Sequence, residues 1–389
     1  MYGVYQTYYQ SSLLHTRSES DISWIGSIEG FLLMSVSIIA GPIYDAGYTW
    51  ALLLSGTTLT VLGMMMTSLC SQYWEFMLAQ GVTVGIGCGL LFLPSVVMVS
   101  QYFTTKLAFA TGIASTGSSL GKSPTPRSLP RIILLIHNSG AVIYPVVFSQ
   151  FQPRIGFPWT VRTLAFIMLF TSAISLPFMR QRLPAHAIRK PFDLAAFKER
   201  PYLFANCGVF FGFMGIYVPF FYAEIYAQSV CHTSDHVAFY LLAIINTGSI
   251  FGRLIPNFLA DKTGPLNMQI GFGCVAAVLA FCWIGVRDSA GIVVWCVLYG
   301  FFSGTFVSLA GPIMVSLSPD HGTVGTRMGM ALGSSGMGLL VGSPIAGTIL
   351  RSHGWSGLQA WCGVLLILSN LCMLSARVAK VGHFWSAVG

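Results

Sequence analysis

The sequence has 389 residues, of which 54% are apolar and only 8% are charged, with a mean hydropathy of +0.71. Because soluble domains carry about a quarter charged residues, this composition excludes a water-soluble protein and predicts a membrane protein. The net charge is +8, but the basic residues are spread between apolar runs and form no basic face with aromatic neighbours. We therefore expect them to set the orientation of the chain in the membrane, and we expect no nucleic-acid partner.

Nine cysteines are scattered through the chain, with no CxxC pair and no metal-ligand spacing. This distribution argues against a disulfide framework and a zinc site, so we expect no metal and no cofactor. No cleavable signal peptide is evident, because Met1 leads straight into aromatic and polar residues. We also expect no enzyme, since His, Asp and Ser side chains do not cluster at one depth.

Apolar stretches long enough to cross a bilayer recur along the whole chain. A spanning helix needs about 20 apolar residues, and residues 1–10 are too short to cross. The stretches predict an all-α polytopic membrane protein. They cover residues 23–42, 51–69, 74–100, 107–147 with an interruption, 160–179, 202–224, 237–255, 268–286, 291–317, 326–350 and 358–376.

The middle of the chain holds the largest group of basic residues, which mark the cytoplasmic side of a membrane protein. They are Arg180, Arg182, Arg189, Lys190, Lys198 and Arg200. Pro184, Pro191 and Pro201 interrupt helix continuity in the same region. We therefore predict a cytoplasmic linker at 180–201 between an N-terminal bundle, 1–179, and a C-terminal bundle, 202–389.

The two halves share one pattern of glycines. Gly112, Gly117 and Gly121 superpose without a gap on Gly333, Gly338 and Gly342. This repeat indicates a parallel duplication and two pseudo-symmetric bundles. After Gly121 the first half alone adds prolines and charges, so we interpret residues 122–140 as an insertion within a spanning helix, such as a retained intron. The alternative is a genuine loop.

One apolar stretch, 237–255, contains polar residues on a single face. Asn246, Ser249, Arg253 and Asn257 recur at three- and four-residue steps and therefore lie on one side of a helix. Unpaired polar groups are costly in hydrocarbon, so this face should meet a cavity or a neighbouring helix rather than lipid.

The turn that follows carries a family resemblance. Asp261-Lys262-Thr263-Gly264 resembles the D-[RK]-x-G loop motif of the major facilitator superfamily, and Gly252-Arg253 is similar to the helix-eight signature of its monocarboxylate-porter family, fungal branch. The resemblance covers nearly the whole chain. It implies a major facilitator fold in which residues 1–10 look like the end of a truncated first helix. Asn257 departs from the family glycine, and Ser249 stands where mammalian members pair an aspartate with the arginine.

The candidate substrate-binding residues are Arg253, Asn246, Ser249, Tyr217 and Phe221. The Arg253 guanidinium is permanently charged and fits a carboxylate; the alternative is an arginine that snorkels to the interface or pairs within the bundle. Tyr217 and Phe221 flank Pro219, whose kink is typical of midplane binding sites, although packing in the core is the alternative.

The resemblance also implies gating residues. Asp45 and Asp261 would clamp the cytoplasmic gate by meeting helix N-termini, with Lys262 beside them, and a carboxylate is favoured at such an end by the helix dipole. The Asp45 copy lacks the basic residue and one spacer and is the weaker match. Glu29, in the middle of a span, is the candidate for proton coupling; the alternative is a protonated carboxyl that is only hydrogen-bonded.

Together these features favour a secondary carrier of a small organic anion such as a monocarboxylate, working by alternating access, with proton coupling left open. The alternatives are an efflux transporter for a fungal secondary metabolite and a truncated or mis-spliced product defective in transport. The expected partners are the small-molecule substrate and the lipid bilayer of the cell membrane, and the sequence leaves the oligomeric state open.

Overall fold

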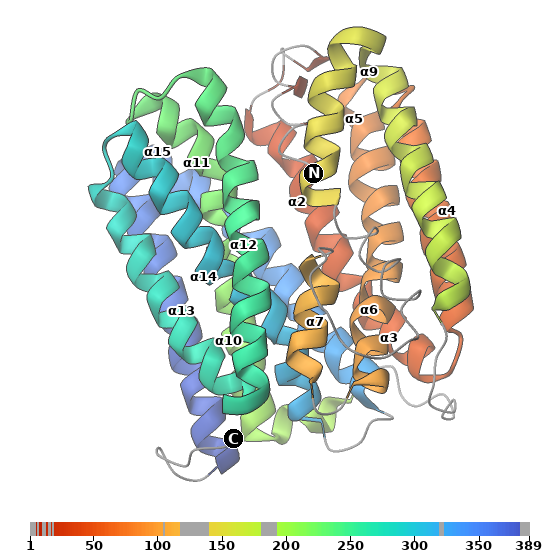
Figure 1. Ribbon diagram of the computed structural model, residues 1–389, viewed down its shortest axis with the longest axis vertical. Helices are drawn as coiled ribbons and strands as arrows, with labels where there is room; N and C mark the ends of the chain where they lie inside the picture. Colours follow the sequence, from red (N-terminus) through yellow and green to blue (C-terminus); the bar gives the residue numbers. More distant parts are fainter. Residues whose placement is uncertain are drawn as a thin grey trace. The chain divides into compact units, whose positions relative to one another are not determined.

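The computed structural model describes residues 5, 8–9, 13–14, 17, 19–103, 106–116, 140–179, 193–318 and 323–381. Every regular element within these ranges is helical, which confirms the predicted all-α class (Figure 1). The predicted insertion, apart from Gly140, and most of the predicted linker lie outside the described residues. The elements are α2 (Glu19–Ser35), α3 (Ser37–Asp45), α4 (Thr49–Thr67), α5 (Tyr73–Phe76), η2 (Met77–Val84), α6 (Gly85–Tyr102), α7 (Leu107–Thr116), α9 (Gly140–Ser175), η3 (Leu176–Phe178), η4 (Leu194–Lys198), α10 (Arg200–Ile216), α11 (Val218–Ser229), α12 (Asp235–Thr263), α13 (Pro265–Cys282), η5 (Trp283–Gly285), α14 (Ser289–Ser316) and α15 (Val324–Val381).

Eight of the described helical stretches are long and apolar enough to cross a membrane. Several of them join consecutive elements, such as α2 with α3 and α10 with α11. This agrees with the expectation of many spans, because each stretch is within or above the range of lengths that cross a bilayer core. The stretches are Trp24–Asp45, Thr49–Thr67, Tyr73–Tyr102, Gln150–Ser175, Arg200–Ser229, Pro265–Gly285, Ser289–Ser316 and Val324–Val381.

Two long elements are broken by a glycine. Gly156 in α9 has a φ of 76°, and Gly354 in α15 has a φ of 67°. Side chains disfavour this left-handed backbone, whereas glycine adopts it without a steric cost. Each glycine therefore separates two straight helical segments within one continuous run.

The chain forms two compact units. Unit 1 comprises Met1–Tyr102, Thr116–Phe192 and Gly322–Gly333, and unit 2 comprises Phe103–Ser115, Asp193–His321 and Ser334–Gly389. The division assigns nearly all of α7 to unit 2 and the first turns of α15 to unit 1. Each unit therefore includes the start of a helix that, in the sequence, belongs to the other half.

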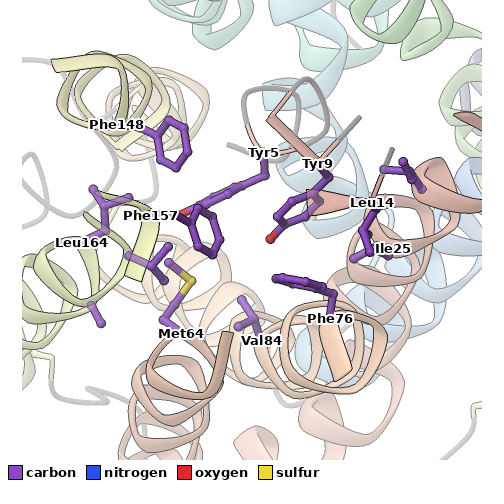
Figure 2. Close-up of a cluster of buried hydrophobic side chains, with 13 residues drawn as sticks. Tyr5, Tyr9, Leu14, Ile25, Met64, Phe76, Val84, Phe148, Phe157 and Leu164 are labelled. Carbon is purple, nitrogen blue, oxygen red and sulfur yellow. The ribbon is translucent and has the colours of Figure 1, made fainter. Parts of the chain in front are cut away.

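An aromatic cluster forms the core of unit 1 (Figure 2). The Tyr9 ring lies 4.6 Å from that of Phe76, and Tyr5 meets Phe148 edge to face at 5.0 Å. Such tilted and edge-to-face pairs are the arrangements that ring quadrupoles favour. The N-terminal residues, expected only as a stub too short to cross, thus contribute two of the most deeply buried side chains of this unit.

Glycines hold α12 and α14 close together in unit 2 (Figure 1). A Cβ added at Gly252 would lie 1.8 Å from the carbonyl oxygen of Phe301, and one at Gly300 would lie 2.1 Å from that of Ile245. Gly248 and Gly304 make equivalent approaches one turn away on each helix. Small residues at four-residue spacing let helix backbones meet in this way inside membranes.

Candidate functional site

Asp45, the last residue of α3, caps the first turn of α15 within unit 1. Its carboxylate accepts hydrogen bonds from the backbone N–H of Gly325 at 3.1 Å and of Thr326 at 2.8 Å, and from the Thr326 hydroxyl at 2.8 Å. The first N–H groups of a helix have no partner within the helix and carry its positive partial charge. The aspartate therefore satisfies these donors and neutralises that charge.

Asp261, near the end of α12, does the same for α7 within unit 2. The backbone N–H groups of Ala108 and Phe109 donate to its two carboxylate oxygens at 2.8 and 3.0 Å. The exposed Lys262 lies over the ring of Phe258, with its ammonium nitrogen 5.1 Å from the ring centroid. Phe258 in turn packs against Phe109 of α7 at 5.6 Å. Two hydrogen bonds of Asp261 and the ring contact of Phe258 thus join the end of α12 to the start of α7.

The two caps occupy different registers of the repeat. Because Gly112 aligns with Gly333, the first residue of α7, Leu107, aligns with Met328, whereas α15 begins four residues earlier at Val324. Four residues are about one helical turn. Each aspartate meets the first turn of its helix, so the position of the cap follows the start of the helix and not the aligned glycines.

Arg253 lies in the middle of α12, partly buried and with most of its donors unused. Its Nη1 donates to the carbonyl oxygen of Ser115 in α7 at 2.5 Å. Its buried Nε has no partner, and among the described residues no carboxylate forms an ion pair with it. A guanidinium has five N–H donors and keeps its charge in proteins. The arginine therefore retains the capacity to bind an anion.

Two other residues of the polar stripe, Ser249 and Asn257, face a neighbouring helix, which is one of the two outcomes predicted for the stripe. Ser249 is 2% exposed and packs against Gly304 of α14. Asn257 is 0% exposed and donates to the Ser308 hydroxyl of α14 at 2.8 Å. Asn246 donates only to the carbonyl of Leu242 within α12, at 2.9 Å. The Asn257–Ser308 hydrogen bond thus links two helices, whereas the Asn246 amide bonds within its own helix.

The departure of Asn257 from the family glycine is compensated by a glycine on another helix. A Cβ added at Gly112 of α7 would lie 2.5 Å from the amide nitrogen of Asn257 and 2.3 Å from the carbonyl oxygen of Arg253. Such distances are far below van der Waals contact, so only glycine fits there. The close approach of α7 is therefore preserved although α12 carries the larger residue.

Tyr217 lies at the junction of α10 and α11, where Pro219 starts the second helix. It is half-buried, packs against the Phe220 ring at 5.5 Å and is an electrostatic neighbour of Arg253. Phe221, also half-buried, follows one turn along α11. The structure thus brings Tyr217 toward the arginine, while Ser249 lies on the α14 side of α12.

Glu29 of α2 lies beside two polar residues that the sequence analysis did not select. The Gln80 side-chain amide donates to Glu29 Oε2 at 3.5 Å, and the Tyr9 hydroxyl donates to Gln80 Oε1 at 2.5 Å. Gln80 is an isolated polar residue within the predicted span 74–100. The argument used for Arg253, that polar groups inside a span need partners, could therefore have found it.

The described residues contain no group of three or more His, Cys, Asp or Glu side chains that could hold a metal ion. What they do contain is a set of membrane-spanning helices, two capped helix starts and buried charged residues of both signs. Buried ionisable groups inside spans are typical of transport pathways. The fold and these features together define a multi-pass integral membrane protein of the carrier type.

The comparisons give the family. The model of the Major Facilitator Superfamily matches residues 2–125 and 132–322, and the chain belongs to this superfamily of membrane transporters. The fold is also that of solved members: the Escherichia coli fucose:proton symporter FucP superposes with a TM-score of 0.68, over 97% of this chain and 96% of that one, at 13% sequence identity.

Fungal transporters are among the relatives of this chain. MFS-type transporter dbaD of Emericella nidulans is 39% identical over 96% of this chain and 81% of its own length. The aspyridones efflux protein apdF of the same organism is 38% identical over 97% of this chain and 73% of its own length. These similarities agree more closely with the efflux alternative than with the monocarboxylate assignment.

Proposed function

We propose that this protein exports a secondary metabolite that carries an acidic group, by alternating access between two bundles, 1–179 and 202–389, in the cell membrane. The relatives named for efflux support the direction and the class of substrate. The acidic group is inferred from the chemistry of the chain itself. Binding sites of such carriers lie near the bilayer midplane between the two halves.

The observation that carries this proposal is the unpaired guanidinium of Arg253. It is held by one backbone carbonyl and has no carboxylate partner among the described residues. A charge that is already neutralised within the fold gains little from a ligand, whereas an unpaired arginine gains a charge-assisted, two-pronged hydrogen bond from a carboxylate or enolate. Tyr217 supplies ring surface beside the guanidinium, and Phe221 and Asn246 complete the proposed binding set. Ser249, which is packed against α14, is left out of it.

We further propose that the caps formed by Asp45 and Asp261, with Lys262, hold the cytoplasmic ends of α15 and α7 during part of the transport cycle. Each cap is built from charge-assisted hydrogen bonds to a helix start, which are stronger than neutral ones. They also involve few atoms, so a small displacement of either partner breaks them. That combination suits a gate that opens once in each cycle.

A second candidate substrate is a small monocarboxylate, moved with a proton. The Gly252-Arg253 signature and the presence of an acidic residue, Glu29, in α2 favour it. In that case Arg253 would bind the carboxylate and Glu29 would carry the proton. The two candidates share the arginine and differ in the size of the substrate.

Transport into inside-out membrane vesicles tests the proposal. Vesicles from a host that expresses the chain are given aromatic acids, their neutral methyl esters and short aliphatic monocarboxylates, with and without a pH gradient. We expect uptake of the larger acids and not of their esters. Uptake of short monocarboxylates alone would favour the second candidate, and equal uptake of acids and esters would refute recognition of an anion.

A further inference from the structure

The surroundings of Glu29 form a short chain of polar groups inside unit 1. Tyr9 donates to the Gln80 carbonyl oxygen at 2.5 Å, and the Gln80 amide nitrogen donates to Glu29 at 3.5 Å. Gln80 is 2% exposed and Tyr9 is 0% exposed, whereas Glu29 is only partly buried. The carboxyl group is therefore the accessible end of a chain whose other members are sealed in the core.

Gln80 reaches this position through an unusual piece of backbone. Residues Met77–Val84 form a π-helix, η2, between the α-helices α5 and α6. Such segments are rare and frequently occur at functional sites, because the extra residue in the turn redirects the side chains. A Cβ added at Gly85 would lie 3.1 Å from the carbonyl oxygen of Glu29, so the glycine allows the end of η2 to approach the Glu29 backbone closely.

The chemistry of Tyr9, Gln80 and Glu29 allows the direction of hydrogen-bond donation among them to reverse. A carboxylate can only accept, so it needs the NH₂ side of Gln80, and the Gln80 carbonyl then accepts from Tyr9, as the structure has it. A protonated carboxyl can also donate its O–H, and it does so to Gln80 when the carbonyl side of the amide faces it. The NH₂ group would then face Tyr9, whose hydroxyl oxygen can accept. The same three side chains thus serve both protonation states after one amide flip.

We propose that Gln80 and Tyr9 are the positioning residues of Glu29, and that their reversible hydrogen-bond chain sets the pH at which this carrier responds to protons. The inference rests on the proposed function only for its link to transport. Gln80 does not carry the proton; the proton stays on Glu29, and the direction of donation along the chain reverses. The 3.5 Å distance is at the long end of the hydrogen-bond range, so a small movement of η2 strengthens or breaks it.

Other ionisable groups surround the carboxyl. Tyr5, from the N-terminal segment, and Cys88, from α6, are its electrostatic neighbours, and Tyr144 of α9 neighbours both of them. Tyr5 provides a matched control, because it lies in the same aromatic cluster as Tyr9 and its buried hydroxyl has no hydrogen-bond partner. Removing that hydroxyl changes the cluster as little as removing that of Tyr9 but leaves Gln80 untouched.

The test uses the purified full chain in lipid nanodiscs. Infrared difference spectra across a pH titration follow the carboxyl band that disappears in Glu29→Gln, with no transport required. Three further variants are compared with the parent protein: Gln80→Leu, Tyr9→Phe and Tyr5→Phe. The pH profile of vesicle transport is measured in parallel.

Without the Gln80 donor the carboxylate is disfavoured, so in Gln80→Leu we expect the titration midpoint to rise by about one pH unit, a tenfold change in proton affinity. In Tyr9→Phe the Gln80 amide keeps Glu29 as a partner and loses the Tyr9 hydroxyl, so we expect a smaller rise of about half a unit. In Tyr5→Phe the midpoint should stay unchanged.

Equal midpoints in the parent, Gln80→Leu and Tyr9→Phe would overturn the positioning role, as would an equal shift in Tyr5→Phe. Because the infrared titration needs no substrate, these results do not depend on whether the tested acids are transported. Absence of transport with the predicted infrared shifts would instead count against the proposed substrate. Shifted infrared midpoints with an unshifted transport profile would refute the link to the proton response.

Discussion

The two units have the same kind of aspartate cap at the start of a helix, but they carry opposite charges in their interiors. Asp45 caps α15 in unit 1 with three hydrogen bonds, and Asp261 caps α7 in unit 2 with two. Inside, unit 1 contains Glu29, which neutral polar groups contact, whereas unit 2 contains Arg253, whose one hydrogen bond among the described residues goes to a backbone carbonyl. A duplicated fold thus preserves the caps and lets the interior diverge.

The comparison also shows that the poorer match to the sequence motif can form more hydrogen bonds. The Asp45 copy of the loop motif lacks a basic residue and a spacer, yet it accepts at least three hydrogen bonds from the described residues, whereas Asp261 accepts two. The extra donor is the Thr326 hydroxyl, whose position in the repeat lies two residues before the start of α7. Contacts to a helix end depend on where the helix begins, which the motif does not encode.

The largest effect should come from the interior of unit 2. We expect Arg253→Ala to reduce transport of an acidic substrate at least about 100-fold, because the charge-assisted pair with the substrate is lost in a site of low dielectric. Arg253→Lys should retain part of the activity, since it keeps the charge and loses the fork. Vesicle uptake, normalised to the amount of protein at the membrane, measures both.

A suitable control on the same helix is Thr247→Ala. Thr247 is exposed, and its hydroxyl bonds only to the Ala243 carbonyl within α12. Its uptake should match that of the parent protein. Normal uptake in Arg253→Ala would show that the arginine has no part in the mechanism. It would also show that the difference in interior charge between the two units does not matter for transport.

The caps come next in magnitude. Asp45→Asn and Asp261→Asn each remove the charge that faces a helix start and one of the two accepting oxygens. We expect a loss of about 1–3 kcal/mol of stability in each, with the greater loss in Asp45→Asn because it has more hydrogen bonds. Thermal unfolding in detergent ranks the two variants, and the reverse order would contradict the comparison drawn above.

A steric change should break the unit 1 cap while keeping its charge. A Cβ added at Gly325 would lie 2.3 Å from Asp45 Oδ1, so Gly325→Ala must displace the carboxylate. We expect a loss of about 1–2 kcal/mol, the range for overpacked sites that can partly relax. Gly271→Ala in α13 is the matched control, because nothing lies within 4 Å of its added Cβ. Equal unfolding temperatures for the two variants would show that the cap tolerates the methyl group.

The smallest change should make the two caps alike. Thr326→Val removes one hydroxyl from the Asp45 cap, keeps the β-branched shape and leaves two backbone donors, as in the Asp261 cap. We expect a loss of about 1 kcal/mol, the usual net value of one hydrogen bond. In the Thr326→Val background, Asp45→Asn and Asp261→Asn should then lower the unfolding temperature by similar amounts. A persistent difference would assign the asymmetry to something other than Thr326.

Much of the fold could be predicted from the sequence, because its signals are local. Apolar runs specify helices, and the polar residues at 246, 249, 253 and 257 predicted a face that meets neighbouring helices, as Ser249, Arg253 and Asn257 do. The partner helices were not predictable: periodicity places Ser249 and Asn257 on one face but does not show that α14 covers it. Nor could it show that Gly112 makes room for Asn257, since the two residues are 145 positions apart in the chain.

The chain around Glu29 was missed for a different reason. A π-helix has no distinctive sequence pattern, and the stretch 74–100 indicates an ordinary apolar helix. Tyr9 lies in a segment too short to cross the membrane, so no periodicity linked it to a span. The substrate class was also beyond the reach of local signals, because the arginine signature is compatible with an acid of any size.

The insertion at 122–140 stays a prediction, and one observation supports it. Gly112 and Gly333 are 221 residues apart, whereas the two left-handed glycines, Gly156 and Gly354, are 198 apart. If these glycines are counterparts, the first half is longer by 221 minus 198, which is 23 residues, between the two points. Sequencing the mature transcript decides whether these residues are retained.

The reciprocal glycine contacts between α12 and α14 have a mechanical consequence. Gly248, Gly252, Gly300 and Gly304 bring the two backbones so close that neither helix can slide without colliding with the carbonyls of the other. Asn257 and Ser308 add a polar tie at the same interface. The two helices should therefore move together as a rigid body. Any displacement of Arg253 on substrate binding would then also displace α14, including its stacked rings Trp295 and Tyr299.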